Sequence, residues 1–224
     1  MNNLHTITPC SLLFPRYDPG MKESRLEQIG SAAAGIAHDL NNQLNLIVNY
    51  LADGARVDEA REAAQRCSAL TNGLLTYCRT EALVNQSLDP AKIARKFVNE
   101  FTVPEGITLE VDIPHSLPLM RANLLAVTRA MFNLAKNACD AMNGNGTLRI
   151  TATAQQIDIA DSGPGICQDH LAKIFEPFFT TKKGDGFGLG LPIVRELMRE
   201  MGGYVTACSE PGVGTNFTLR FRAA

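Results

Sequence analysis

The sequence predicts an α+β, multidomain protein: an antiparallel helical hairpin is followed by an α/β sandwich, in which a mixed sheet carries helices on one face. Three observations predict this fold. An apolar repeat of helical period runs through the first third of the chain. Later, short stretches alternate apolar and polar residues as strands do. These strands come in pairs between helices, whereas a three-layer βαβ fold would require strict alternation of strand and helix.

Two helices are predicted within residues 23–86, separated by a break at Asp53-Gly54. The apolar positions are Leu26, Ile29, Ala33, Ile36, Leu40, Leu44, Ile47 and Leu51 in the first helix, and Val57, Ala60, Ala64, Cys67, Leu70, Leu74 and Tyr77 in the second. Helices joined by so short a turn are antiparallel neighbours. A single hairpin cannot cover its own apolar stripe, so a second copy is expected to complete a dimeric four-helix bundle. The alternative is that the stripe packs against the rest of the same chain.

Residues 87–224 form the second predicted part. Helices are predicted over residues 91–101, 121–142 and 191–201, and strands over residues 107–113, 147–153, 155–161, 203–209 and 214–222. Asn143-Gly144 ends the second of these helices and Gly202-Gly203 ends the third. Residues 1–22 contain three prolines and no periodicity, so they are expected to be a tail or a short partner-binding segment.

Composition and charge exclude several classes of protein. A net charge of −2 gives no electrostatic basis for binding nucleic acid or an anionic membrane. No apolar run approaches the ~18 residues of a membrane span, and the N-terminus lacks the basic start of a signal peptide. The six cysteines are scattered, without a C-x-x-C pair, so reduced thiols in a cytoplasmic protein are expected.

The segment DSGPGI begins with Asp161, at the end of a predicted strand and beside a tight turn. Gly163 and Gly165 remove side chains where the backbone approaches another group closely. A carboxylate at such a position can accept a hydrogen bond from an exocyclic amine. Taken alone, an ordinary Asp-Ser-Gly turn explains the segment equally well.

Glycines alternate with other residues over 184–190, directly before a predicted helix. The backbone amides of such a loop, together with a helix N-terminus, form a cradle for phosphate oxygens. Neither the Walker nor the Rossmann pattern is present, since no lysine-serine pair closes the loop and no strand opens it. Phosphate binding is favoured here over a purely structural glycine loop.

Two further segments hold candidate ligand-binding residues. Asn133 and Asn137 lie one helical turn apart, so both amides project from one face, where their oxygens can ligate magnesium. Polar helix faces are also common without any such role. The segment FEPFFTTKKG, residues 175–184, is typical of a mobile lid, and its Lys182 could contact phosphate, although loop lysines are usually only solvated.

Five motifs in one order carry a resemblance to a known family: AHDLNN at residues 37–42, then N-x-x-x-N, D-x-G-x-G, F-x-P-F-F and G-x-G-x-G. They resemble the core of a bacterial sensor histidine kinase of two-component signalling, over residues 23–222. The first motif resembles the phosphoacceptor box, and residues 87–224 resemble the Bergerat-type ATP-binding fold of gyrase, Hsp90 and the mismatch-repair ATPases. The resemblance implies autophosphorylation from ATP and Mg²⁺, followed by transfer to an aspartate of a separate response regulator.

The resemblance also implies residue roles. His38 would accept the phosphoryl group, Asp39 would be its acid–base partner, and Asn42 would position water for dephosphorylation. Asn137 would ligate magnesium; the nucleotide would be bound by Asn133, Asn137, Asp161, Gly163, Gly165, Lys182, Gly186, Gly188, Leu189, Gly190 and Thr215. At ~100° per residue His38 lies off the apolar stripe and is expected to face solvent, where an imidazole is a competent nucleophile.

One position separates phosphoryl transfer from hydrolysis. The related ATPases place a glutamate one turn before the magnesium asparagine, where it activates water. Asn133 occupies that position here, and an amide cannot act as a general base at neutral pH. Slow ATP hydrolysis without a protein acceptor is therefore expected.

Two rival functions stay open: an ATP-independent histidine phosphotransfer protein with a degenerate nucleotide domain, and a serine kinase or ATPase on the same nucleotide fold. The intact glycine motifs disfavour the first, and the long histidine hairpin disfavours the second. The expected partners are a second copy of the chain and the receiver domain of a response regulator, with no nucleic acid. Since residues 1–22 are too few for a sensor domain, the input is expected from a separate sensor protein or from further parts of a longer chain.

Overall fold

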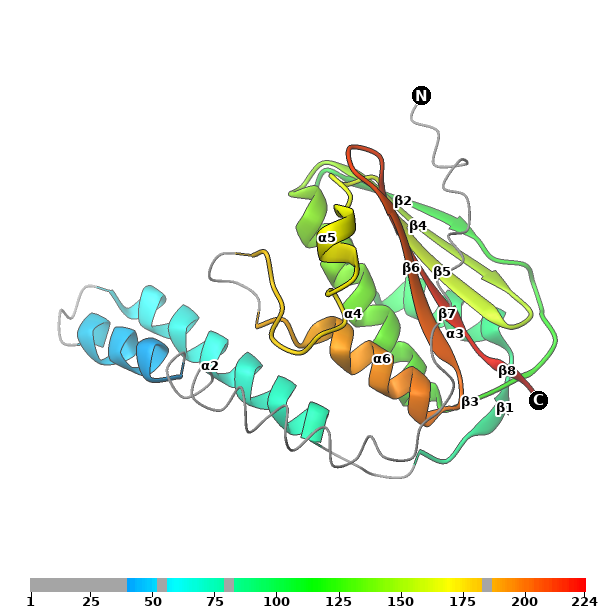
Figure 1. The fold of residues 1–224 in the computed structure, drawn as a ribbon, viewed down its shortest axis with the longest axis horizontal. Helices are drawn as coiled ribbons and strands as arrows, with labels where there is room; N and C mark the ends of the chain where they lie inside the picture. Colours follow the sequence, from blue (N-terminus) through cyan, green and yellow to red (C-terminus); the bar gives the residue numbers. More distant parts are fainter. Residues whose placement is uncertain (1–39, 52–55, 79–82, 183–186) are drawn as a thin grey trace. The chain divides into compact units, whose positions relative to one another are not determined.

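The structure, a computed structural model, describes residues 40–51, 56–78, 83–182 and 187–224 (Figure 1). The chain divides into two compact units. The described residues of the first unit are 83–175 and 190–224, and those of the second are 40–51, 56–78, 176–182 and 187–189. The predicted division at residues 22 and 86 stays a prediction.

A five-stranded mixed sheet forms the centre of the first unit, in the strand order β2-β4-β5-β7-β6. β2 (Ile107–Asp112) runs parallel to β4 (Gly146–Thr153). The other neighbours are antiparallel: β4 pairs with β5 (Gln156–Asp161), β5 with β7 (Gly214–Arg220), and β7 with β6 (Tyr204–Glu210). The predicted mixed sheet is confirmed.

Three helices cover one face of this sheet (Figure 1): α3 (Pro90–Glu100), α4 (Leu124–Met142) and α6 (Gly190–Glu200). Local signals start and stop them. The side chain of Asp89 accepts a hydrogen bond from the Ala91 N–H at the start of α3, where Pro90 suits the first helical position. Asn143, with a left-handed φ of 48°, ends α4.

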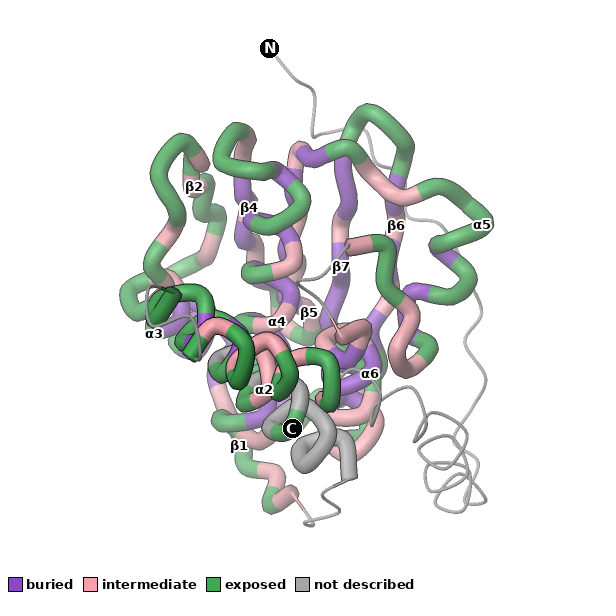
Figure 2. Tube along the Cα trace, turned by 90° about the vertical axis from the view of Figure 1, so that its left-hand side faces the viewer, coloured by how far each residue is buried: buried purple, intermediate pink, exposed green. Residues whose placement is uncertain are grey.

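The core lies between the sheet and the three helices. Buried and more accessible residues alternate along β4, β5 and β6, as expected for a sheet with one covered face, whereas β7 is buried over most of its length. Figure 2 shows buried stretches on all four strands. The largest fully buried side chains are Met120, Val127, Met131, Leu134, Leu148, Ile150, Ile157, Ile159, Val194, Met198 and Leu219. Their burial holds β5 and α4 in fixed positions, and both elements carry candidate site residues.

The sequence analysis missed a second, three-stranded antiparallel sheet of order β1-β3-β8. Its strands, Gln86–Leu88, Met120–Ala122 and Arg222–Ala223, are too short to show an alternating pattern. The helix predicted from residue 121 therefore begins at Leu124, because β3 occupies the preceding residues and Asn123 caps the helix. The short helix α5 (Gln168–Leu171) was also not predicted.

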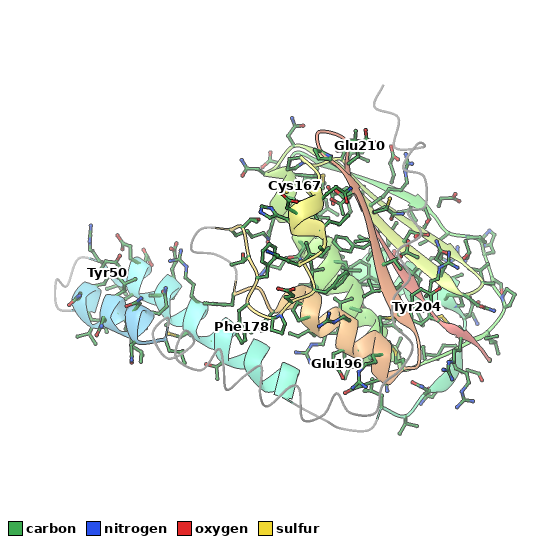
Figure 3. All side chains as sticks on the ribbon, viewed as in Figure 1. Tyr50, Cys167, Phe178, Glu196, Tyr204 and Glu210 are labelled. Atoms are coloured by element: carbon green, nitrogen blue, oxygen red, sulfur yellow. The ribbon has the colours of Figure 1, made fainter. Side chains whose placement is uncertain are left out.

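The second unit contains two helical segments, residues 40–51 and α2 (Val57–Cys78). The guanidinium of Arg56 lies 5.3 Å from the ring centre of Tyr50, which brings together the facing ends of these segments (Tyr50 is labelled in Figure 3). Ala60 is buried on α2. Within the described residues, no helix combines the length and the apolar character that crossing a membrane requires.

Candidate functional site

Asp161 ends β5 on the face that the helices cover, directly opposite Thr215 of β7. Its Oδ1 atom accepts a hydrogen bond from the Gly163 N–H at 2.9 Å, and the Thr215 N–H also donates to the carboxylate. Burial raises the pKa of Asp161 to about 6, against the opposing effect of these two hydrogen bonds. At neutral pH the side chain is therefore a buried, ionised acceptor.

The turn after Asp161 requires glycine at two positions. A methyl group on Gly163 would lie 2.8 Å from Asp161 Oδ1 and 3.5 Å from the Ala141 side chain. Gly165 has a left-handed φ of 69°, and a methyl group there would lie 2.2 Å from the Glu210 carbonyl oxygen. The turn thus packs against the β6–β7 hairpin, and Figure 3 shows Cys167 and Glu210 at the same end of the sheet.

Replacing Gly165 with alanine should destabilise the first unit by ~3 kcal/mol or more, because the clash with Glu210 is added to the cost of a positive φ. Gly212→Ala is the matched control: Gly212 also has a positive φ, 81°, but a methyl group there meets nothing within 4 Å. The control should lose only ~1–2 kcal/mol. Denaturant unfolding of both variants measures the difference, and equal losses would contradict the packing described here.

Asn133 and Asn137 of α4 face the first residue of α6. A methyl group on Gly190 would lie 3.4 Å from Asn133 Oδ1 and 3.6 Å from Asn137 Nδ2. The amide group of Asn133 donates to the Arg129 carbonyl oxygen at 2.9 Å. Two amide side chains and a helix N-terminus therefore converge on a space where a side chain is absent, an arrangement suited to an anion and its cation.

Helix α4 links this amide pair to Asp161. Ala141, one turn after Asn137, lies beside Gly163 in the turn that follows Asp161. Between them, the pKa of the buried Cys139 thiol is raised by burial and by the negative charges of Asp140 and Asp161. The amide pair and the residue that packs beside the Asp161 turn thus lie within little more than two turns of the same helix.

The loop before α6 belongs to the second unit. The Phe178 N–H donates to the Gly188 carbonyl oxygen at 3.0 Å, which closes the loop on itself. Gly188 has a φ of 63°, and a methyl group there would lie 2.5 Å from the Phe179 carbonyl oxygen. Leu189 is buried, and the half-buried Lys182 donates its backbone N–H to Thr180 Oγ1 at 3.1 Å.

Three predicted site residues, His38, Asp39 and Gly186, lie outside the described residues. Asn42 is exposed on the helical segment 40–51. Within the first unit, the structure brings Asp161, Gly163, Gly165 and Thr215 together at one end of the sheet, and Asn133, Asn137 and Gly190 at the start of α6. Lys182, Gly188 and Leu189 stand in the loop of the second unit.

The sequence analysis did not single out Ser209, which is buried on β6 opposite Thr215. Its Oγ atom lies within hydrogen-bond distance of the Ile166 N–H, the Gly214 carbonyl oxygen and the Thr215 hydroxyl. Ser209 lies opposite Thr215 because Glu210 pairs with Gly214 across the turn, and this register is seen only in the folded hairpin.

Residues 122–224 match the family described as "Histidine kinase-, DNA gyrase B-, and HSP90-like ATPase". Among curated relatives, the sensor histidine kinase ZraS of Escherichia coli (strain K12) is 31% identical over 220 residues, covering 90% of this chain and 47% of ZraS. The sensor kinase CckA of Brucella abortus (strain 2308) is 32% identical over 231 residues, covering 88% of this chain and 24% of CckA. The chain thus spans about half of the first relative's length and a quarter of the second's.

Two solved structures are similar in fold. Full-length ShkA in complex with AMPPNP has a TM-score of 0.62 at 25% sequence identity, and the matched region covers 88% of this chain and 46% of the ShkA chain. Histidine kinase ThkA, in complex with the response regulator protein TrrA, has a TM-score of 0.73 at 22% sequence identity, and the matched region covers 91% of this chain and 64% of the ThkA chain. The likeness to ThkA extends to the fold alone.

Proposed function

Because the chain carries the core of a bacterial sensor histidine kinase, with an ATP-binding domain at residues 122–224, we propose that it is an ATP-dependent kinase that phosphorylates its own His38. The phosphoryl group would then pass to an aspartate in the receiver domain of a separate response regulator. The observation that carries the proposal is the convergence of Asn133 and Asn137 on Gly190, along the helix that also passes Asp161.

The nucleotide would be bound from both ends. The ionised carboxylate of Asp161 would accept a hydrogen bond from the adenine amine, in a pocket shaped by Gly163 and Gly165. The backbone amides at the start of α6 would bind phosphate oxygens, because N–H groups at a helix N-terminus have no partner within the helix. ShkA, which is similar in structure, was solved with AMPPNP.

A magnesium ion fits the amide pair at the start of α6. Magnesium prefers oxygen ligands and is commonly held by few protein groups together with substrate phosphates. Asn137 would supply a protein oxygen, with Asn133 one turn earlier, and the bound ion would neutralise charge on the phosphates. Because Asn133 is an amide, no general base stands at this position to activate water, which favours transfer over hydrolysis.

His38 would be the acceptor, and Asp39 would hold or take up the proton of its imidazole. Asn42, exposed on the helix that follows, would position water when the partner is dephosphorylated. The ATP-independent phosphotransfer protein is not favoured, because residues 122–224 match a family of ATPases and the relatives are sensor kinases.

Incubation of the chain with γ-labelled ATP and Mg²⁺, followed by chemical treatment of the labelled protein, tests the function. Phosphohistidine is expected, so acid should remove the label and alkali should leave it in place. A purified receiver domain, when added, should take up the label. Acid-stable label would identify a serine kinase instead. ATP binding that is absent by calorimetry would favour the phosphotransfer protein.

A second copy of the chain is proposed to cover the apolar stripe of the first helix. Leu44 and Leu51 of this stripe are 50% and 56% exposed. Val48, which the stripe did not include, is 64% exposed, and its spacing of four from Leu44 and three from Leu51 places it on the same face. Isolated exposed leucines are common, but a contiguous helical stripe favours an interface. The exposed fractions support the proposed four-helix dimer.

Substitution Val48→Glu should convert the dimer to a monomer, raising its dissociation constant at least ~100-fold, because each copy would bury an unpaired carboxylate. Asn49→Glu is the matched control: Asn49 is also exposed but lies on another face of the same helix. Light scattering after size exclusion gives the mass of each variant. A monomeric control, or a dimeric Val48→Glu variant, would place the interface elsewhere.

A further inference from the structure

Asp161, Thr215 and Ser209 form one row across three neighbouring strands, β5, β7 and β6 (Figure 1). Residues directly opposite each other in a sheet project from the same face. All three side chains are buried, on the face that the helices cover. The row therefore places two hydroxyl groups next to the carboxylate that is proposed to bind adenine.

Protein groups use the whole hydrogen-bonding capacity of the Ser209 hydroxyl. Its oxygen lies 2.7 Å from the Ile166 nitrogen, 2.9 Å from the Gly214 carbonyl oxygen and 2.9 Å from the Thr215 hydroxyl oxygen. A hydroxyl group has one proton and two lone pairs. Since the Ile166 N–H only donates and the Gly214 carbonyl only accepts, the proton of Ser209 goes to Gly214. The contact with Thr215 must then use the proton of Thr215.

This proton count determines what Thr215 can offer a ligand. With its proton donated to Ser209, the Thr215 hydroxyl can make any further hydrogen bond only as an acceptor. Ionised Asp161 is likewise an acceptor only. A purine with an amine at position 6 can donate directly to such acceptors, whereas a carbonyl at that position meets only lone pairs.

We propose that Ser209 is a positioning residue for base selection: it fixes the Thr215 hydroxyl as an acceptor and thereby favours a 6-amino purine over a 6-oxo purine. The inference rests on the proposed function, because it takes Asp161 and Thr215 as part of the base pocket. Ser209 acts only through Thr215 and touches no reacting atom. Its effect is therefore on the choice of base.

The test compares ATP with ITP, which carries a carbonyl in place of the amine, on the whole chain with Mg²⁺. Calorimetry gives both dissociation constants, and the quantity measured is their ratio, ITP over ATP. In Ser209→Ala the proton of Thr215 is released and can be donated to the carbonyl, so the ratio should fall about tenfold. Ser209→Thr keeps a hydroxyl and should keep the wild-type ratio. General weakening of the pocket would affect both nucleotides and leave the ratio unchanged.

Repeating the comparison in a Thr215→Val variant shows whether the change in the ITP/ATP ratio depends on Thr215. In Thr215→Val, adding Ser209→Ala should not lower the ratio further; an equal fall there would overturn the proposal. An unchanged ratio in a folded Ser209→Ala variant would also overturn it. If that variant does not fold, Ser209→Cys replaces it, because a thiol accepts weakly and should lower the ratio in the same direction. Wild-type protein that binds neither nucleotide would overturn the proposed function itself, whereas ATP binding with an unchanged ratio overturns this inference alone.

Discussion

Replacing His38 with glutamine should lower incorporation of label from γ-labelled ATP at least ~1000-fold, because the acceptor nitrogen is removed while a polar side chain is kept at the position. ATP binding should be unchanged, since the residues proposed to bind the nucleotide belong to other segments. Label incorporation is measured by gel autoradiography, and binding by calorimetry, on the same preparations. Loss of both together would point to misfolding instead.

Two other histidines provide matched controls for this substitution. His115 and His170 are both exposed, so an accessible imidazole alone could in principle be labelled at either position. His115→Gln and His170→Gln should retain full labelling. A variant without His38 that still consumed ATP rapidly would contradict the expectation that Asn133 leaves the site without a base for hydrolysis.

The mixed sheet could be predicted from the sequence because its strands are long enough to alternate. The isoleucines of β5 at positions 157 and 159 point to the core and place Asp161 on the same face at the strand's end. The strand Met120–Ala122 has only three residues, too few for a period of two to be distinguished from a helix start. Its pairing with β1 and β8 is made by residues distant in sequence, which no local pattern reports.

Some residues of the candidate site could likewise be predicted from the sequence, and others could not. The glycine motifs could be found in the sequence because glycine is the residue that best tolerates a positive φ or a close backbone contact, as at Gly165. Ser209 could not be found by type, since a buried serine has many ordinary explanations. Its importance depends on the register that places it opposite Thr215, and register is a property of the folded hairpin.

Replacing Asp161 with asparagine should weaken ATP binding at least ~100-fold at pH 7.5. The substitution keeps the size of the side chain and one acceptor oxygen for the Gly163 N–H, but it exchanges an ionised acceptor for a donor that faces the adenine amine. Asp158→Asn is the matched control, because Asp158 stands on the same strand but on the opposite face, where it accepts a hydrogen bond from Thr218. Equal weakening in the control would show that the effect is one of strand stability.

The pKa of Asp161 adds a dependence on pH with opposite signs for binding and for stability. Below about pH 6 the carboxyl is protonated and loses an acceptor, so the affinity for ATP should fall by up to tenfold per pH unit. Purine riboside triphosphate corrects for titration of the phosphates, because it carries the same phosphates but no amine.

The pKa of Asp161 is raised from 3.8 by burial, so the native state binds the proton more tightly than the unfolded state does. This contribution to stability is complete below pH 3.8 and is lost as pH rises through 6, by at most ~3 kcal/mol. Relative to Asp161→Asn, wild-type protein should therefore become less stable to denaturant as the pH rises from 4 to 7, while its affinity for ATP increases. If stability and ATP affinity changed in the same direction, the assignment of this buried carboxylate to the adenine site would be contradicted.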